Sequence, residues 1–499
     1  MRPSAGSVRA VKATIQRLRG RLGALSAIIA GAVLLRLIAG VAFVNYDTLY
    51  ALGWGGQLAR GETPAYGVPI APTPHPLLEL LGLILYPLGA RTELDLILAL
   101  AFGALAACGW VIYSLGRRWF GTAAGLLAAA IFLTRAEILS YGVRAYLDIP
   151  YLLFVLWALL VEVRRPRAGA PVLALLALAG LLRPEAWVFS GLYWLYMLDL
   201  LPAGLRAHLP AGERPQGRAE VALLTALTAI GPLIWLGSDL LVTGNPLWSL
   251  TNTRHTATTL DRTTGIVNVP EYIPRRIGEI LRPPVLLGAA IGGIVTLRWM
   301  RTRAMPAALV GVLVVIVFAA FASVGLPINT RYAFLASAIL CLFCGAGVFG
   351  WIVLEPGDPR RRIWIALGAL IALTLLAYVP SQYSGANGDF TKLARQERVE
   401  GDLVALVRSG AVNLRCGPVG VPNHAPIPLL ALYLKASPQR IQSPESGRIS
   451  SGVYVAPAGK EVEEDYELDK RDPHESVSVP PGFTGSASNR SWLIFERCG

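Results

Sequence analysis

The segment that decides the fold is Leu22–Val44, LGALSAIIAGAVLLRLIAGVAFV, which is apolar apart from Arg36 and ends at Asn45-Tyr46-Asp47-Thr48. A run of this kind can cross a bilayer as one helix, because about 20 apolar residues span the hydrocarbon core. The segment therefore places the carboxylate of Asp47 just beyond the end of a first membrane span. Ionisable groups at the edge of a membrane are costly and often functional, so Asp47 is the first candidate site residue.

The composition of the whole chain is that of a polytopic membrane protein. Of its 499 residues 54% are hydrophobic and 15% are charged, and the mean hydropathy is +0.52. Further apolar blocks recur as far as Pro380. The net charge of +13 does not indicate a nucleic-acid partner, because the basic residues lie in short loops between these blocks. The positive-inside rule assigns such loops to the cytoplasm.

One topology places all of these basic loops on the cytoplasmic side. A basic cytoplasmic segment, residues 1–21, precedes a transmembrane domain at 22–380 with about eleven spans. The apolar segment 76–89 is too short to be a span, at about 20 Å for a rise of 1.5 Å per residue, and follows a first interfacial helix at 47–60. The spans are expected at 22–44, 93–115, 121–134, 149–163, two within 170–201, and then at 221–243, 284–297, 307–324, 332–354 and 363–378.

The same topology places three segments outside the cytoplasm. Two are loops, at 45–92 with its interfacial helices and at 244–283. The third is residues 381–499, where the composition becomes polar and predicts an extracytoplasmic soluble domain of mixed α/β type. Within it we expect helices at 390–408 and 426–435, strands at 452–456 and 491–496, and a solvated loop over the charged run 460–475.

The cysteines agree with this arrangement. Cys416 and Cys498 are the two cysteines of the external domain. In an oxidising compartment they would form a disulfide closing a loop of about 80 residues, worth about 4 kcal/mol in the chain-entropy model. Cys108, Cys341 and Cys344 lie in apolar spans; the Cys341-x-x-Cys344 spacing is typical of metal sites, but the absence of other ligands there favours packing.

The unusual charges at the ends of the spans all fall on the external side of this topology. Arginines at one membrane face can hold an anionic lipid phosphate as it leaves. A carboxylate within reach can take the proton of an acceptor hydroxyl. Together they predict transfer of a group from a lipid phosphate to an alcohol. The charges are Asp47, Arg144, Asp148, Arg183, Glu185, Arg254, His255, Arg275, Arg276 and Arg331.

The order of several motifs resembles the GT-C superfamily of polyprenyl-phosphate-sugar-dependent glycosyltransferases, in particular its protein O-mannosyltransferase and aminoarabinose transferase branch. The resemblance covers residues 22 to 380 or so. Protein O-mannosyltransferases carry an Asp-Glu pair where this chain has Asp47 alone, which argues against a protein acceptor. The motifs are Asp47, Pro74-His75-Pro76, Gly116-Arg117-Arg118-Trp119-Phe120-Gly121, Tyr146-Leu147-Asp148-Ile149-Pro150, Gly180-Leu181-Leu182-Arg183-Pro184-Glu185 and Asn329-Thr330-Arg331-Tyr332.

The resemblance implies roles for two carboxylates. Asp47 corresponds to the proposed general base, and Asp148 to an aspartate near the donor phosphate or a metal. The leaving phosphate is already a weak base, so no cofactor is required; a divalent cation at Asp148 stays an alternative without a clear ligand set. Residues expected to bind the donor phosphate or sugar are Arg331, Asp148, Arg144, Arg183, Glu185, His75 and Tyr50.

Each of these residues also has a structural interpretation. Asp47 and Asp148 are placed to cap helices. Arg331 is placed to anchor a helix at the interface. Arg183 and Glu185 are near enough in sequence to pair with each other. His75 lies between prolines in a loop, and Tyr50 fits an aromatic interface belt equally well.

These observations predict an integral membrane inverting glycosyltransferase at the outer face of the plasma membrane. It would move a sugar from a polyprenyl phosphate to a cell-envelope glycan or lipid. A transporter or flippase for a lipid-linked glycan would use the same cavity without chemistry, but such folds often show matched broken helices and only one break is evident, at Arg183-Pro184. A membrane-anchored scaffold would leave the charges at the membrane edge unexplained.

Overall fold

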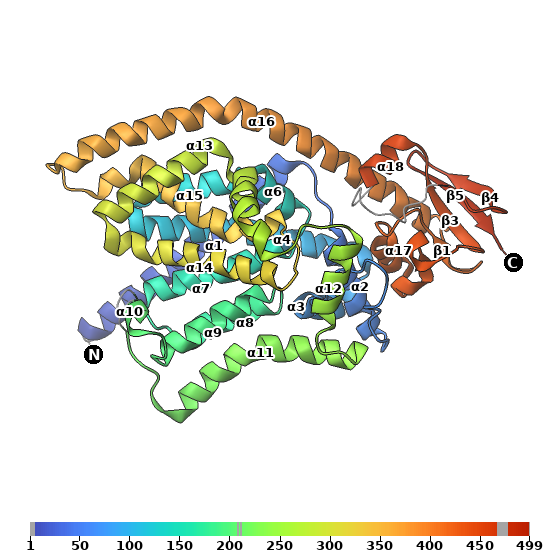
Figure 1. Cartoon of the computed structure of the whole chain (residues 1–499), viewed down its shortest axis with the longest axis horizontal. Helices are drawn as coiled ribbons and strands as arrows, with labels where there is room; N and C mark the ends of the chain where they lie inside the picture. Colours follow the sequence, from blue (N-terminus) through green and yellow to red (C-terminus); the bar gives the residue numbers. More distant parts are fainter. Residues whose placement is uncertain (1–4, 207–208, 210–211, 467–477, 499) are drawn as a thin grey trace.

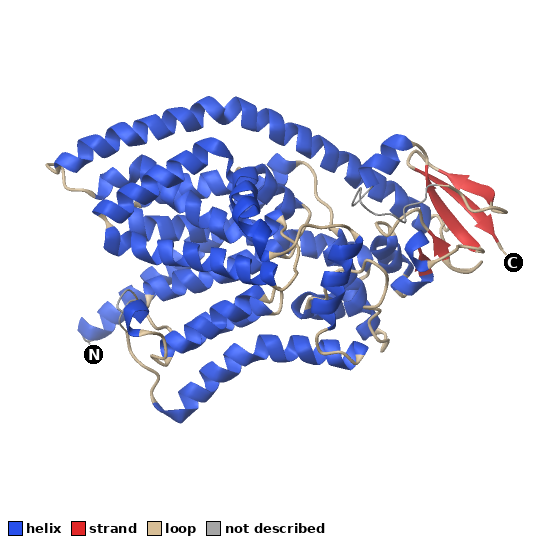
Figure 2. Cartoon of the chain, in the orientation of Figure 1, coloured by secondary structure: helices blue, strands red, loops and turns tan. Residues whose placement is uncertain are grey.

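The computed structural model describes residues 5–206, 209, 212–466 and 478–498. It consists of a large body of helices and a small sheet at the end of the molecule away from the N-terminus (Figure 1). Figure 2 shows that all the strands lie in this one region.

Each predicted span corresponds to a helix of the structure. The helices are α1 (Ala5–Ala39), α2 (Tyr46–Ala59), α3 (Pro76–Leu85), α4 (Ala90–Phe120), α5 (Thr122–Leu133), α6 (Ala136–Val143), α7 (Asp148–Arg164), α8 (Ala170–Gly180), α9 (Glu185–Met197), α10 (Ala203–Arg206), α11 (Gly217–Thr243), α12 (Trp248–Thr259), α13 (Val269–Trp299), α14 (Arg301–Ser323), α15 (Phe334–Phe349), α16 (Pro359–Arg408), α17 (Ile427–Leu434) and α18 (Lys460–Tyr466). Short 3-10 turns occur among them, including η3 (Thr330–Ala333) before α15.

The polytopic helical fold is confirmed. By length and composition, seven helices in the described part of the chain can cross a membrane, or eight if α5 and α6, bent by 64°, form one span. The other predicted spans are α7, α8 and α9, which have 17, 11 and 13 residues. Helix α8 packs against α7, α9 and α11, so these short helices are held within the bundle. The number of about eleven spans stays a prediction.

Helices α2 and α3 correspond to the two predicted interfacial helices and pack directly on each other. A Cβ atom on Gly55 would lie 2.3 Å from the Glu79 carbonyl oxygen, and one on Gly82 would lie 2.7 Å from the Leu52 carbonyl oxygen. Only glycine allows this approach, which fixes the position of α2. Tyr50 of α2, expected at the membrane interface or the site, is completely buried.

Helix α16 connects the bundle to the C-terminal domain. It continues without interruption past Pro380 to Arg408, and Figure 1 shows it along one edge of the bundle. Near the predicted boundary at residue 381, Gln382 donates a hydrogen bond to the Thr134 carbonyl and accepts one from Arg135. The division into domains therefore crosses a continuous helix, and its boundaries stay predictions.

The C-terminal domain is built on a five-stranded mixed sheet of order β2-β1-β3-β5-β4. Strand β1 is parallel to β2 and β3, whereas β5 is antiparallel to β3 and β4. The strands are β1 (Val419–Gly420), β2 (Ile441–Gln442), β3 (Gly452–Pro457), β4 (Thr484–Ser488) and β5 (Trp492–Arg497). Trp492 is fully buried and donates a hydrogen bond to the Val399 carbonyl of α16, which holds the sheet against that helix.

Several predictions for this domain can be compared with the structure. Strands β3 and β5 match the two expected strands, and α17 matches the helix expected at 426–435. A disulfide joins Cys416 and Cys498, the pair expected from the sequence. The charged run 460–475 was expected to be a loop, but α18 occupies its first seven residues and the rest lies outside the described residues.

Candidate functional site

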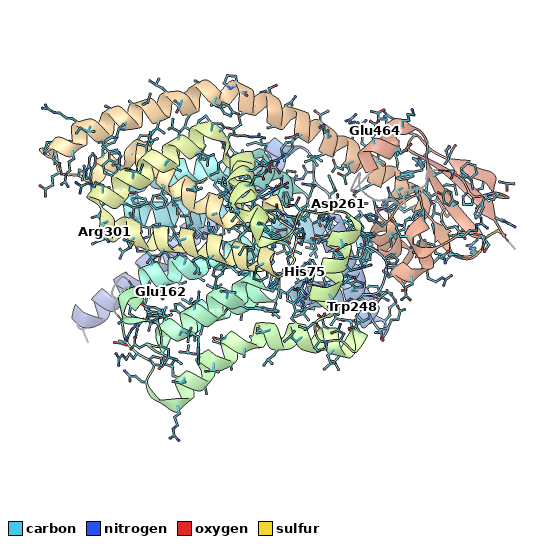
Figure 3. The ribbon with its side chains drawn as sticks, in the orientation of Figure 1. His75, Glu162, Trp248, Asp261, Arg301 and Glu464 are labelled. Atoms are coloured by element: carbon cyan, nitrogen blue, oxygen red, sulfur yellow. A yellow bond between two sulfur atoms is a disulfide. The ribbon has the colours of Figure 1, made fainter. Side chains whose placement is uncertain are left out.

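A cavity of about 720 Å3 lies where the helical bundle, α2, α12 and the C-terminal domain meet. Figure 3 labels His75, one of its lining residues, between the bundle and the C-terminal domain. The charged and histidine side chains that line the cavity are Asp47, His75, Arg183, Glu185, Asp239, Arg262, Arg276, Arg331 and His424.

The wall of the cavity carries a row of alternating charges. Arg331 Nη1 lies 2.7 Å from Asp47 Oδ2 and 3.8 Å from Asp148 Oδ2. On the other side of Asp148, Arg183 forms a salt bridge with that carboxylate and lies 2.6 Å from Glu185 Oε1. Three carboxylates and two guanidinium groups are thus connected, and Arg331 is shared between the two aspartates.

Each charge in this row stands at the end of a helix. Asp47 is in the first turn of α2, Asp148 is the first residue of α7, and Arg331 lies in the turn before α15. Arg183 and Glu185 flank the break between α8 and α9. Side chains at helix ends reach the cavity without breaking the apolar faces that the same helices bury.

The structure excludes one structural interpretation of the two aspartates, the capping of a helix by the side chain. Asn45, not Asp47, caps α2, because its side chain accepts from the Thr48 amide. No side-chain hydrogen bond caps α7, and the Asp148 carboxylate binds Arg183 instead. Neither aspartate is therefore explained by capping, and both are available to the site.

Opposing effects set the pKa of Asp47. Burial raises it, but the charge of Arg331 and the hydrogen bond that Arg331 donates outweigh burial, so the pKa is lowered overall. Asp47 is thus a carboxylate paired with a cation. Were Arg331 engaged elsewhere, burial would be left as the main effect and the affinity of Asp47 for a proton would rise.

His75 is buried beside this row and neutral at ordinary pH. Burial lowers the pKa of His75 to about 3, against the attraction of Asp47 and with the help of Arg183 and Arg331. Its Nδ1 atom has no hydrogen-bond partner among the described residues. The ring packs edge-on to Trp235, with the two ring centres 5.7 Å apart. A neutral imidazole so placed can accept a hydrogen bond from a ligand in the cavity.

Tyrosine rings surround the guanidinium groups. Arg183 lies 4.3 Å from the centre of the Tyr332 ring, and Arg331 lies 6.0 Å from that of Tyr146. Arg144 lies over Tyr146 as well, at 4.9 Å, while its guanidinium donates to Ser140. Such cation–π contacts hold the charged groups in place in surroundings poor in water.

The structure brings together most of the predicted site residues. Asp47, His75, Arg183, Glu185 and Arg331 line the cavity. Asp148 is buried behind Arg331 and Arg183. The other two predicted residues, Arg144 and Tyr50, lie behind the residues that line the cavity.

Arg144 and Tyr50 do not line the cavity. They reach it only through neighbouring rings, Arg144 through Tyr141 and Tyr146, and Tyr50 through Tyr46. Two of the other charges expected on the external side also lie outside the cavity lining: Arg254 binds the Val324 carbonyl, and Arg275 binds Glu279.

Sequence reasoning missed three features of the cavity. Asp239 is buried in α11, and both of its carboxylate oxygens accept from Ser249. A carboxylate inside an apolar segment is a recognisable signal that could have identified it. Arg262 lies in the loop that follows α12, and His424 belongs to the C-terminal domain; nothing in their local sequence points to the cavity.

Among the described residues, no group of three or more His, Cys, Asp or Glu side chains at this cavity is close enough to hold a metal ion. The one such group in that part of the chain lies elsewhere, at Cys416, Glu496 and Cys498, whose cysteines are joined in the disulfide. The two aspartates of the cavity are bridged by Arg331. Independence from a divalent cation stays a prediction.

The fold is similar to that of ArnT from Cupriavidus metallidurans. The structure of ArnT bound to undecaprenyl phosphate aligns with 95% of this chain and 98% of its own, at a TM-score of 0.56 and 15% identity. ArnT in the apo state aligns over the same shares, at a TM-score of 0.53 and 14% identity. No family model and no curated protein sequence matches the chain. The likeness confirms the GT-C fold that the motifs implied.

Proposed function

We propose that this protein is an integral membrane glycosyltransferase that takes a sugar from a polyprenyl-phosphate donor and transfers it to a hydroxyl group. One observation carries the proposal: a carboxylate and a guanidinium group, Asp47 and Arg331, touch on the wall of a large cavity. The fold supports it, since it resembles that of ArnT, whose solved structure holds undecaprenyl phosphate.

The mechanism follows from the position of Arg331. A donor phosphate in the cavity would compete with Asp47 for this guanidinium, which carries N–H groups suited to phosphate oxygens. Once Arg331 has turned to the phosphate, burial raises the proton affinity of Asp47, which makes it a better base. Ligand binding and activation of the base would then be coupled through one side chain.

In the transfer step, the acceptor oxygen attacks the anomeric carbon from the side opposite the phosphate. The bond between that carbon and the phosphate oxygen breaks, and its electron pair leaves with the polyprenyl phosphate. Asp47 takes the proton of the acceptor hydroxyl, and Arg331 balances the charge that develops on the phosphate. Arg262 and Arg276, which also line the cavity, add positive charge for the donor.

We further propose that transfer takes place at the outer face of the plasma membrane, to a cell-envelope glycan or lipid. The disulfide of the C-terminal domain suits an oxidising compartment. The cavity extends to that domain, since His424 contributes to its lining. The basic loops of the bundle fit the opposite, cytoplasmic side.

The test is sugar transfer by the purified protein in proteoliposomes. Undecaprenyl phosphates carrying radiolabelled glucose, mannose, galactose or aminoarabinose serve as donors, and octyl glycosides serve as acceptors. Asp47→Asn should lower the rate of sugar transfer by about 100-fold or more, which is the scale of general-base catalysis. The variant should still bind undecaprenyl phosphate. Asp199→Asn, in a cluster away from the cavity, serves as the matched control and should keep full activity.

Two outcomes would contradict the proposal at different levels. Full activity of Asp47→Asn would refute the assignment of the base. A wild-type protein that transfers sugar from none of these donors, yet moves a labelled lipid-linked glycan between leaflets, would support the transporter alternative.

A further inference from the structure

A small space of about 30 Å3 lies behind the row of charges and is lined by α7, α14 and α15. Asp148, Val317 and Phe334 of these three helices line it, together with Arg331. Arg331 also lines the large cavity, so its side chain stands between the two spaces. Because about 10–15 Å3 is enough for one water molecule, the small space leaves room for a guanidinium group to shift by a short distance.

Two opposite charges beside this space lack a hydrogen bond to each other. Asp148 Oδ2 and Arg331 Nε are both buried and have no hydrogen-bond partner among the described residues. Arg331 Nη1 lies 3.8 Å from Asp148 Oδ2, which is too far for a hydrogen bond. Buried polar atoms without partners are costly, because they lose their hydration without replacement. A carboxylate and a guanidinium group are therefore close to a bond that they do not make.

The two arginines of the row differ in how firmly they are held. Arg183 donates three hydrogen bonds, one to Asp148 and two to Glu185. The guanidinium group of Arg331 donates a single hydrogen bond among the described residues, to Asp47. Loss of one bond is therefore enough to release Arg331, whereas Arg183 and Asp148 form a fixed frame beside it.

A shift of Arg331 toward Asp148 exchanges one carboxylate for another. The bond to Asp47 is lost and a bond to Asp148 Oδ2 is gained, so the number of hydrogen bonds within the protein stays the same. Contacts between a phosphate and the other N–H groups of Arg331 are then a net gain of the shifted state. A ligand moves an equilibrium by such a difference between two states. Asp47 is left without its cation, which raises its affinity for a proton.

We propose that Asp148 is the second partner of Arg331, which receives the guanidinium group when a lipid phosphate binds and so releases Asp47 to act as the base. The inference rests on the proposed glycosyltransferase function and adds to it how donor binding is coupled to activation of the base. Asp148 is a positioning residue that acts through Arg331, and it does not line the large cavity. Its other carboxylate oxygen stays with Arg183.

A substitution in the small space tests this movement without removing a charge. Val317 is buried and lines the space. Val317→Leu adds one methylene group there, fills the room that the guanidinium group needs, and leaves every charge of the row in place. Val315→Leu is the matched control, because it adds the same group on the same helix at a side chain that is 38% exposed and lines neither space.

The experiment measures the Kd of undecaprenyl phosphate for the full-length protein in nanodiscs, and sugar transfer in proteoliposomes with the donors named above. Val317→Leu should raise the Kd about tenfold, the factor that corresponds to one ordinary hydrogen bond. It should also lower kcat, because Asp47 stays paired with Arg331. Val315→Leu should match the wild type in both. Asp148→Asn removes the oxygen that receives Arg331 and should raise the same Kd.

The Arg331→Gln background separates movement of Arg331 from a general distortion of the protein. With no guanidinium group to move, Val317→Leu should add nothing to the Kd of Arg331→Gln. An additive effect would mean that Val317→Leu acts elsewhere, and it would overturn the inference. A single variant Val317→Leu with the Kd and kcat of the wild type would overturn it as well, and this is the result expected if the space holds only a bridging water molecule.

Failure of the proposed function would look different. A wild-type protein that transfers sugar from none of the donors would overturn the assignment as a glycosyltransferase, and with it the role of Asp47 as a base. The Kd values do not depend on transfer, so they would still decide whether Arg331 changes its partner when the lipid phosphate binds.

Discussion

Two clusters of arginine and aspartate occupy different places in this protein and illustrate different uses of charge. In the cavity, Arg331 and Arg183 connect Asp47, Asp148 and Glu185, and these five residues come from four separate parts of the chain. Near the short helices α7 to α9, Arg167 and Arg214 both pair with Asp199. The Asp148 side chain is 2% exposed, whereas that of Arg214 is 75% exposed.

The second cluster closes loops that are local in the chain. The Arg167 amide donates to Glu162, and Tyr193 donates to the same carboxylate, so that residues at the ends of α7, α8 and α9 are tied together. None of these residues lines the cavity. Charges at the ends of membrane helices therefore do not identify a site by themselves. A site is indicated instead where charges from distant parts of the chain meet at one cavity.

Substitution of Asp148 should show the largest difference between the two clusters. Asp148→Asn leaves the buried Arg183 with Glu185 alone and should lower stability by about 3–5 kcal/mol, as expected when one member of a buried pair is removed. Asp199→Asn should cost less, because its partner Arg214 is exposed to water and its other partner, the buried Arg167, keeps a hydrogen bond to the Tyr196 carbonyl. Thermal unfolding in detergent, followed by intrinsic tryptophan fluorescence, measures both. An equal or larger loss for Asp199→Asn would contradict the comparison.

Arg331 should separate the clusters in ligand binding. Arg331→Gln removes charge-assisted hydrogen bonds to a phosphate and should weaken binding of undecaprenyl phosphate about 10- to 100-fold. Arg167→Gln removes the same group from the other cluster and should leave the affinity unchanged. Microscale thermophoresis with the lipid in nanodiscs gives both dissociation constants. Equal affinities for wild type and Arg331→Gln would exclude Arg331 as the phosphate-binding group.

Substitution of His75 should have the smallest effect on stability at neutral pH, and its effect should become visible only at acidic pH. Because the pKa of His75 is about 3 in the folded protein and near 6.5 when exposed, the unfolded chain takes up a proton between these values and the folded protein does not. As the pH is lowered from about 6.5 to about 3, the free energy of unfolding should therefore fall by about 1.4 kcal/mol per pH unit from His75 alone. His75→Gln should remove this slope, measured as the pH dependence of the unfolding midpoint. An unchanged slope would mean that His75 is protonated in the folded protein.

Parts of the site could be read from the sequence, and the reasons differ from residue to residue. Asp47 stood out because an apolar run ends abruptly beside it. Asp239 carries a similar signal inside α11 but was overlooked. The choice between Asn45 and Asp47 as the cap of α2 could not be made from the sequence, since both residue types cap helices well. Tyr50 was expected either to bind the donor or to lie in an aromatic belt at the membrane interface, yet the packing of α2 buries it completely.

The sequence by itself determined the class of fold, because an apolar run of about 20 residues can cross a bilayer as a helix, and the length and the charged ends of such a run are local properties of the chain. It also placed Asp47, Asp148, Arg183 and Arg331 at helix ends. Only the tertiary structure decided that these four ends meet, that Arg331 lies between two aspartates, and that His424 of a distant domain lines the same cavity. The physical reason is that a pairing between charges depends on how whole helices pack, which no local stretch of residues encodes.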